Sequence, residues 1–324
     1  MMPVTPEPGY DVTTFGEMLL RLSTPLGERL ETARLLDVHP AGAEANVATL
    51  LARLNCRALW TGALPNNSLG RLAATALRAA GVVMDGVLWR GRGRMGTYYV
   101  EFGAPPRGIH VTYDRAHSCA AEVLPEEIDW KVLLNTRILH LTGITLALSK
   151  SCCEIVNEAV KRARQNGVFV SFDINYRQKL WSETDARQTL LPLISQADLL
   201  FCSQADAVRL FACTGTMQEI AQGLLEQTKA PKVIVTFGEK GFLCWNGDSW
   251  QHEPAQPTQI IDRLGAGDAL AAGVLYGLLH SDLQAGLRYG AVLAALALGQ
   301  NGDMVITTEA EMLALSRQNS TLIR

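Results

Sequence analysis

The segment Gly265-Ala-Gly-Asp268 combines residue types that could stabilise and use negative charge. Two glycines around one alanine let the backbone turn tightly, and the apolar run that follows predicts a helix. The loop amides of Gly265, Ala266 and Gly267, together with the helix N-terminus, would then form an anion hole. Asp268 in the first helical turn is either a carboxylate that complements the helix dipole or a base beside that anion hole. A base and an anion hole suit a hydroxyl that attacks a phosphoryl group.

A second glycine-rich segment, Gly91-Arg-Gly-Arg-Met-Gly96, matches the dinucleotide pattern G-x-G-x-x-G. That pattern binds a pyrophosphate only when a helix begins at the glycines. Residues 97–102 are strand-like instead, so we reject a dehydrogenase. The P-loop pattern G-x-x-x-x-G-K-[ST] is absent from the sequence, so phosphoryl transfer would use another anion site. The neighbouring Arg90, Arg92 and Arg94 either form a solvated loop or face an anionic ligand.

The elements that must position these residues alternate along the second half of the chain. From residue 138 onward, short apolar runs typical of buried strands alternate with helical patterns, which predicts right-handed βαβ units. We therefore expect an α/β fold with a doubly wound, mainly parallel sheet flanked by helices. The expected strands are 138–142, 168–172, 198–202 and 232–237, and the expected helices are 151–165, 183–195 and two long ones within 265–298.

Two stretches, about 17–38 and 95–113, break this alternation because they lack helical periodicity. The second is typical of a β-hairpin, with strands at 96–103 and 109–113 and a Pro-Gly turn at 105–108. We predict that both stretches form a small β-sheet lid on a single domain that spans 1–324.

The composition excludes several classes of function. Of the 324 residues, 48% are hydrophobic and 19% are charged, the balance of a globular chain. A net charge of −3 gives no electrostatic basis for nucleic-acid binding. The seven cysteines are scattered without a C-x-x-C pair, and no stretch reaches the roughly 18 apolar residues of a membrane span. We expect a cytoplasmic protein without a signal peptide, a transition metal, a nucleic-acid partner or a membrane contact.

Two segments resemble signatures of the ribokinase-like (PfkB) carbohydrate kinases. Asp262-Arg-Leu-Gly-Ala-Gly-Asp268 resembles their C-terminal signature, and Pro40-Ala-Gly-Ala-Glu-Ala-Asn46-Val-Ala resembles their N-terminal sugar-binding segment. The resemblance extends over about residues 11–315. It implies a ribokinase-like fold, ATP and Mg²⁺ as the phosphoryl donor and its metal, a small sugar or sugar-acid substrate, and a homo-oligomer that pairs through the lid.

Within that family, the sequence is most similar to the 2-keto-3-deoxygluconate kinases. The segments that carry this similarity are 15–17, 96–98, 113–115, 139–145 and 171–181. The resemblance implies that Asp268 lies at the reacting hydroxyl. The residues that it implies as further substrate contacts are Gly42, Asn46, Tyr98, Tyr113, Arg115 and Arg177.

An arginine suits a sugar acid because its forked guanidinium binds a carboxylate through charge-assisted hydrogen bonds. Tyr98 and Tyr113 could offer hydroxyls to substrate oxygens and shield the site from water. The alternatives are a pair of tyrosines on a strand face, and arginines that pair with surface acids. Arg177 is the stronger candidate of the two arginines because it follows a strand end, where doubly wound sheets bind ligands.

The resemblance also implies where the nucleotide and ions bind. Ser203-Gln-Ala-Asp206 stands in the place of the family's Asn-x-x-Glu segment, with Asp206 as a magnesium ligand. Residues 236–241 resemble the loop along the nucleotide, and the helical segment that ends near Asn301 should border the adenine. Asp262 would help to hold a monovalent cation such as K⁺. The implied nucleotide contacts are Ser203, Thr236, Gly238, Gly241 and Asn301.

Five positions depart from the family pattern. Ala41 replaces the first glycine of a Gly-Gly pair, which bears on close backbone approach to the sugar. Asp206 is one methylene shorter than Glu, and Gln204 is neutral, which bears on metal binding. Arg263 stands where a small residue is usual, and Asp114 stands where the sugar-acid branch often carries a tyrosine.

The sequence thus predicts ATP-dependent phosphorylation of 2-keto-3-deoxygluconate to 2-keto-3-deoxy-6-phosphogluconate, with Asp268 as the general base. A kinase for fructose, a modified deoxy-sugar acid or a nucleoside is the nearest alternative, and a need for Arg115 and Arg177 would discriminate between them. The other alternative is a non-catalytic ligand-binding protein on a kinase fold. The altered segment 203–206 favours that alternative, whereas Asp268 beside its glycines argues against it.

Overall fold

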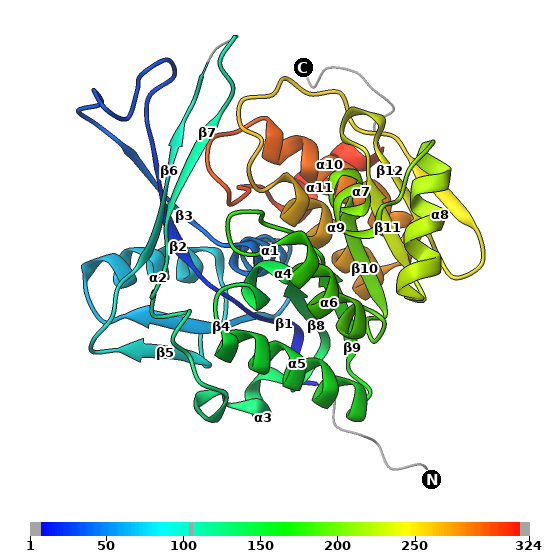
Figure 1. The fold of residues 1–324 in the computed structure, drawn as a ribbon, viewed down its shortest axis with the longest axis horizontal. Helices are drawn as coiled ribbons and strands as arrows, with labels where there is room; N and C mark the ends of the chain where they lie inside the picture. The colour runs from blue at the N-terminus through cyan, green and yellow to red at the C-terminus, as the bar shows by residue number, and fades with distance from the viewer. Residues whose placement is uncertain (1–7, 104–105, 318–324) are drawn as a thin grey trace.

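The main body of the protein is a nine-stranded sheet in the computed structural model, which describes residues 8–103 and 106–317 (Figure 1). Its strands are β1 (Tyr10–Phe15), β4 (Ala58–Pro65), β5 (Val87–Arg90), β8 (Thr136–Thr142), β9 (Phe169–Asp173), β10 (Leu199–Ser203), β11 (Val233–Thr236), β12 (Phe242–Trp245) and β13 (Trp250–Glu253). The strand order is β13-β12-β11-β10-β9-β8-β1-β4-β5. Neighbours from β11 to β5 pair in parallel, and the edge strands β12 and β13 pair antiparallel.

Helices cover both faces of this sheet because its strands are apolar on both sides. They are α1 (Ala43–Arg53), α2 (Ser68–Ala80), α3 (Trp130–Leu133), α4 (Gly143–Leu146), α5 (Lys150–Gln165), α6 (Glu183–Ile194), α7 (Gln204–Phe211), α8 (Met217–Thr228), α9 (Ala266–His280), α10 (Leu283–Leu298) and α11 (Glu309–Arg317), with 3₁₀ turns η1 (Pro125–Glu127) and η2 (Gly238–Lys240). Along β10, Leu199 and Phe201 pack with α1, α9 and α10. The alternate residues Leu200 and Cys202 pack with α5 to α8.

The predicted doubly wound α/β fold is confirmed. The expected strands 138–142, 168–172, 198–202 and 232–237 coincide with β8, β9, β10 and β11, and the expected helices coincide with α5, α6, α9 and α10. The G-x-G-x-x-G segment leads into a strand, as expected, and not into a helix. Arg90 and Arg94 form ion pairs with Glu127 and Asp114 at 2.6 Å, which agrees with the solvated-loop interpretation of those arginines.

A separate four-stranded sheet stands at the upper left of Figure 1, beside the body. Its strands, in spatial order, are β3 (Asp37–Ala41), β2 (Leu19–Ser23), β6 (Gly96–Glu101) and β7 (His110–Asp114). β6 and β7 form the expected antiparallel hairpin, although Pro105 of the expected turn lies outside the described residues. A small core that includes Tyr98 and Val100 packs against Leu264, so this sheet contacts the loop that leads into α9.

Helices α9 and α10 approach each other to backbone contact. A Cβ at Gly273 would lie 2.5 Å from the nitrogen of Gly290, and a Cβ at Gly277 would lie 2.2 Å from the Cα of Gly286. No larger residue fits there without separating the helices. This packing fixes the N-terminus of α9, and with it the loop 262–268.

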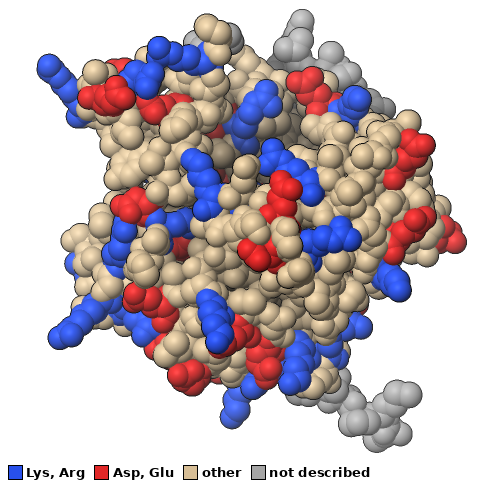
Figure 2. Space-filling model, in the orientation of Figure 1, with Lys and Arg blue, Asp and Glu red and all other residues tan. Residues whose placement is uncertain are grey.

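The face drawn in Figure 2 carries Lys and Arg side chains interspersed with Asp and Glu, without a continuous basic stripe. Within the described ranges, no helix is both long and apolar enough to cross a membrane. All seven cysteines are free thiols.

Candidate active site

The carboxyl ends of β9, β10 and β11 meet the N-terminus of α9 at a cavity of about 280 Å³, which we call the acidic cavity. Parallel sheets bind ligands at this end because their loops converge there. Asp173 and Asn175 contribute to its lining. The residues that the sequence had singled out and that also line it are Arg177, Ser203, Asp206, Thr236, Arg263, Gly265, Gly267 and Asp268.

Gly265 caps the N-terminus of α9 in a left-handed conformation, with φ of 82°. A Cβ at this position would lie 2.3 Å from the backbone oxygen of Asp303. Both constraints favour glycine. Ala266 and Gly267 begin the helix, so their amides lie at its positive end, beside the acidic cavity. This is the arrangement that an anion site requires.

Asp268 lies in the first turn of α9, and its Oδ2 accepts a 2.7 Å hydrogen bond from Nδ2 of Asn46 on α1. Burial raises the pKa of the Asp268 carboxyl to about 8, and Asp173 and Asp303 add to the rise. The Asn46 hydrogen bond and Arg177 oppose it. The cap residue of this helix is a glycine, so Asp268 does not serve as the N-cap. A carboxyl that titrates near neutral pH is suited to accept a proton from a hydroxyl.

Two further carboxyls line the same cavity, Asp173 at the end of β9 and Asp206 in the first turn of α7. Burial raises the pKa of Asp173 to about 7, and the neighbouring Asp206 adds to that rise. Burial also raises the pKa of Asp206. The sequence reasoning missed Asp173, although it ends an expected strand inside the segment 171–181. That position at a strand end was the signal that could have identified it.

Arg177 is half-buried in the loop after β9, and its Nη1 donates to the backbone oxygen of Tyr176 at 3.0 Å. Among the described residues, no carboxylate forms an ion pair with its guanidinium. Its charge opposes the rise in the pKa of both Asp173 and Asp206. An arginine with free donors beside a cavity can bind an anionic ligand.

The two tyrosines that the resemblance implied as substrate contacts lie together on the four-stranded sheet, with ring centroids 5.7 Å apart. Tyr98 donates its hydroxyl to Oδ2 of Asp303 at 2.6 Å. The ring centroid of Tyr113 lies 5.7 Å from both the Arg115 guanidinium and the Lys179 ammonium. Because the Tyr98 hydroxyl already has a protein partner, the strand-face interpretation describes Tyr98 better than a free substrate donor does.

Arg115 is buried, and its Nε donates to Oε2 of Glu17 at 2.7 Å. The alternative of an arginine that pairs with an acid is therefore observed, except that this acid is buried as well. Ser118 donates to the other oxygen of the same carboxylate. Gly42 lies against the same segment, since a Cβ there would be 2.3 Å from the backbone oxygen of Glu17. Neither Arg115 nor Gly42 lines the acidic cavity.

A second cavity of about 500 Å³, which we call the apolar slot, adjoins the acidic cavity and shares Thr236 and Gly267 with it. Gly238 and Gly241, which the resemblance implied as nucleotide contacts, both line the apolar slot. One wall is formed by α10, whose side chains there are small or aliphatic. They are Ala291, Ala294, Ala295 and Leu298.

Two of the implied ligand residues, Asn301 and Asp262, line neither the acidic cavity nor the apolar slot. Helix α10 ends at Leu298, with Gly299 as its C-cap, so Asn301 lies beyond it in an exposed turn and lines neither cavity. Asp262 is fully buried, and its Oδ2 forms a 2.6 Å ion pair with Nη2 of Arg21. Its two oxygens also accept backbone hydrogen bonds at 3.0 and 3.2 Å. Because the guanidinium of Arg21 already compensates its charge, Asp262 does not fit a monovalent cation as an additional partner.

The departures from the family pattern fall in different places. Asp114 is exposed, pairs with Arg94 and does not line the acidic cavity. Ala41 is buried at the end of β3. Arg263 is exposed and lines both cavities, where its charge can face a nucleotide phosphate.

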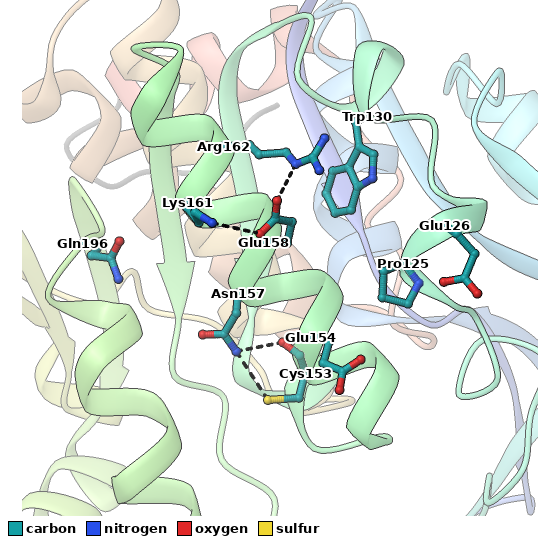
Figure 3. A pocket seen from close by; sticks show the side chains of 10 residues that line it. All are labelled: Pro125, Glu126, Trp130, Cys153, Glu154, Asn157, Glu158, Lys161, Arg162 and Gln196. Atoms are coloured by element: carbon teal, nitrogen blue, oxygen red, sulfur yellow. Dashed lines mark hydrogen bonds and ion pairs between the residues drawn. The ribbon is translucent and has the colours of Figure 1, made fainter.

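Figure 3 shows another hollow, of about 800 Å³, along α5. Three of its charged side chains bind one another: Glu158 forms ion pairs with Arg162 at 2.7 Å and with Lys161 at 3.7 Å. Arg162 also lies 4.6 Å from the ring centroid of Trp130. None of the residues that the sequence singled out lines this hollow, so the acidic cavity is the better candidate.

Comparisons with known proteins agree with this geometry. Residues 11–310 match the family model described as pfkB family carbohydrate kinase. A 2-dehydro-3-deoxygalactonokinase from Haloferax volcanii is 37% identical over 303 residues, which cover 93% of this chain and 95% of the relative. A 5-dehydro-2-deoxygluconokinase from Listeria monocytogenes is 26% identical over 316 residues, which cover 95% and 96%. The crystal structure of 2-dehydro-3-deoxygluconokinase from Thermotoga maritima matches with a TM-score of 0.89 and 33% identity, over 95% of this chain and 98% of that one.

Proposed function

Because the chain belongs to the pfkB family of carbohydrate kinases, we propose that it transfers a phosphoryl group from ATP to the C6 hydroxyl of a 2-keto-3-deoxy sugar acid. 2-Keto-3-deoxygluconate is the substrate that the sequence resemblance implies, and the H. volcanii relative is named for its C4 epimer. One observation carries the proposal: Asp268, with a raised pKa, and Arg177, without an ion-pair partner among the described residues, line one cavity.

Asp268 is the general base of the proposed reaction. The substrate O6 attacks the γ-phosphorus, and its proton moves to Oδ1 of Asp268 while Oδ2 keeps the hydrogen bond from Asn46. The bond between the γ-phosphorus and the bridging oxygen breaks, and ADP leaves with that oxygen. The amides at Gly265 to Gly267 would stabilise the charge on the transferring group, because they lie at the positive end of α9.

Arg177 is proposed to bind the carboxylate of the sugar acid. Its guanidinium has donors that no carboxylate in the described part of the chain occupies, and it shares the acidic cavity with Asp268. Gly42, Asn46, Tyr113 and Arg115 remain proposed contacts at the sugar end of the site, where the four-stranded sheet would shield the reaction from water.

The apolar slot is proposed to hold the adenine of ATP, because the small side chains of α10 offer a flat apolar wall. Thr236, Gly238 and Gly241 would border the nucleotide, and Ser203 would lie near its phosphates. Asp206 is the residue that would hold Mg²⁺: its carboxylate lines the acidic cavity and forms no ion pair within the described residues. When bound, Mg²⁺ neutralises charge on the phosphates.

The test is ADP release with ATP and Mg²⁺ across a panel that contains 2-keto-3-deoxygluconate, its galacto epimer, fructose, ribose and a nucleoside. We expect selective turnover of one or both acids. Turnover of fructose alone would refute the role of Arg177 and leave that of Asp268 intact. No ADP release with any compound of the panel would refute the proposal.

A further inference from the structure

A fully buried arginine lies at the junction between the four-stranded sheet and the body. Arg21 belongs to β2, and its guanidinium contacts Asp262 through Nη2 at 2.6 Å and Asp303 through Nη1 at 2.9 Å. Its Nε donates to the hydroxyl of Ser23 at 2.8 Å, and its guanidinium carbon, Cζ, lies 5.2 Å from the ring centroid of Phe102. Burial of a guanidinium is costly unless its donors are bonded. Here each of the three guanidinium nitrogens, Nε, Nη1 and Nη2, has a protein partner.

The two carboxylates that Arg21 joins flank the proposed anion hole. Asp262 begins the loop to α9 and accepts hydrogen bonds from the backbone nitrogens of Leu264 and Gly302. Asp303 follows α10, and its backbone oxygen is the atom that a Cβ at Gly265 would strike. The same network therefore sets the path of the chain on both sides of Gly265.

The network also reaches a second strand of the four-stranded sheet. Tyr98 on β6 donates its hydroxyl to the Asp303 oxygen that Arg21 does not bind. Arg21 and Tyr98 thus attach neighbouring strands of that sheet to the anion-hole loop, across a sequence separation of 282 residues in the case of Arg21.

The charge at Asp262 is already compensated within the protein. The family resemblance implies a monovalent cation there, and such an ion needs oxygen ligands with free lone pairs and an uncompensated negative charge. The negative charge of Asp262 is compensated by Arg21, and three donors occupy three of the roughly four lone-pair sites of its oxygens. Within the described ranges, no group of three or more His, Cys, Asp or Glu side chains is placed to hold a metal ion.

We propose that the Arg21 guanidinium is the resident cation of the anion-hole loop, and that it takes the place of a monovalent metal ion at Asp262. Arg21 is a positioning residue: it touches no reacting group, and it acts by holding Asp262 and Asp303, which together hold Gly265. The expected effect of Arg21 on kcat rests on the proposed function. The expected effect of Arg21 on the position of the loops around Gly265 does not depend on it. The proposal implies that the kinase works equally well without K⁺.

The first test uses the unmodified protein. Its melting temperature and its kcat are measured in potassium, sodium and tetramethylammonium chloride at one ionic strength. We expect the three melting temperatures to agree, and the three kcat values to agree within about twofold, because no site binds one cation in preference. A melting temperature or a kcat that is raised specifically by K⁺ would overturn the proposal.

The second test uses Arg21→Lys, which keeps the charge but loses the planar fork that bridges two carboxylates. Hydrogen exchange of residues 262–268 and 299–305 should become about tenfold faster or more, while exchange in β8 and β9 stays unchanged. At saturating substrates, kcat should fall by about 10²-fold with the KM for ATP nearly constant, because the anion hole is displaced. The matched control is Arg29→Lys in the loop between β2 and β3, an exposed arginine that pairs with Glu101 on β6.

The outcomes separate the two proposals. Unchanged exchange in both loops of Arg21→Lys would overturn the positioning role, whatever the activity. Faster exchange in both loops, in a protein whose wild type phosphorylates nothing on the panel, would support the positioning role of Arg21 and refute the proposed function. Normal kcat in Arg21→Lys with faster exchange would overturn the catalytic consequence.

Discussion

Replacement of Asp268 by asparagine should lower turnover and raise stability at neutral pH, two effects of opposite sign. The carboxyl has a pKa of about 8 in the folded protein, against an ordinary value of 3.8. Folding at pH 7 therefore requires this group to take up a proton that the unfolded chain does not hold. Because the folded pKa is the higher one, the stability contributed by this group is complete below about pH 4 and is lost as pH rises towards 8.

The size of the effect follows from that difference of about four pKa units. At about 1.4 kcal/mol for each unit, the ceiling is roughly 6 kcal/mol at high pH. Relaxation around the ionised group lowers this ceiling. We therefore expect the free energy of unfolding of Asp268→Asn to exceed that of the wild type by about 1–3 kcal/mol at pH 7 to 8. An asparagine keeps the shape and can still accept the hydrogen bond of Asn46, but it cannot accept a proton. Its kcat should therefore fall by about 10²-fold or more.

The assay combines thermal unfolding at pH 7 and pH 8 with ADP release at saturating substrates. Asp114→Asn is the matched control, since Asp114 is an exposed carboxylate that pairs with Arg94, and both quantities should change little. A variant of Asp268 that is less stable than wild type and retains full turnover would refute the reasoning. That combination would make Asp268 a structural carboxylate.

The pH profile and three residues give further tests. kcat/KM for the sugar acid should rise with pH along a limb with its midpoint near 8, because Asp268 must be ionised to act as a base; a flat rate from pH 6 to 9 would contradict this. Arg177→Ala should raise the KM for the acid by about tenfold or more and leave the KM for ATP nearly constant, whereas equal effects on both would make Arg177 structural. Arg115→Ala should lower the free energy of unfolding, measured in urea, by about 3–5 kcal/mol, because the buried Glu17 is left without a counter-charge. A decrease below about 1 kcal/mol would contradict a stabilising role for that pair. Gly265→Ala should lower kcat by about 10²-fold, because the added Cβ meets the backbone oxygen of Asp303, and unchanged kinetics would remove the anion-hole assignment.

Local patterns in the sequence were sufficient to predict the body of the fold. The strands β8 to β11 are short, mostly apolar runs, and such runs can be recognised from residues that are close together in the sequence. The position of Asp268 was predictable for the same reason, because Gly265, Ala266 and Gly267 precede it directly. The expected helical segment extended to Asn301 because the helical pattern gave no clear end, whereas Gly299 terminates α10 two residues earlier.

The partners of buried charges could not be predicted in this way. Arg21 and Asp303 are 282 residues apart, and Arg115 and Glu17 are 98 apart. Neither pair leaves a periodic signal, since each forms only when the four-stranded sheet meets the body. The resemblance to known kinases implied that Asp262 binds a cation, and it gave no indication of the ion pair that Asp262 forms with Arg21.

Phosphorus NMR of the reaction product tests the central claim most directly. The protein is incubated with ATP, Mg²⁺ and 2-keto-3-deoxygluconate, and the product is examined for the position of the new phosphate. The account predicts a phosphate monoester coupled to the two C6 protons, formed by the wild type and at least about 10²-fold more slowly by Asp268→Asn. Release of inorganic phosphate without a sugar ester, or equal formation of the ester by both proteins, would contradict it.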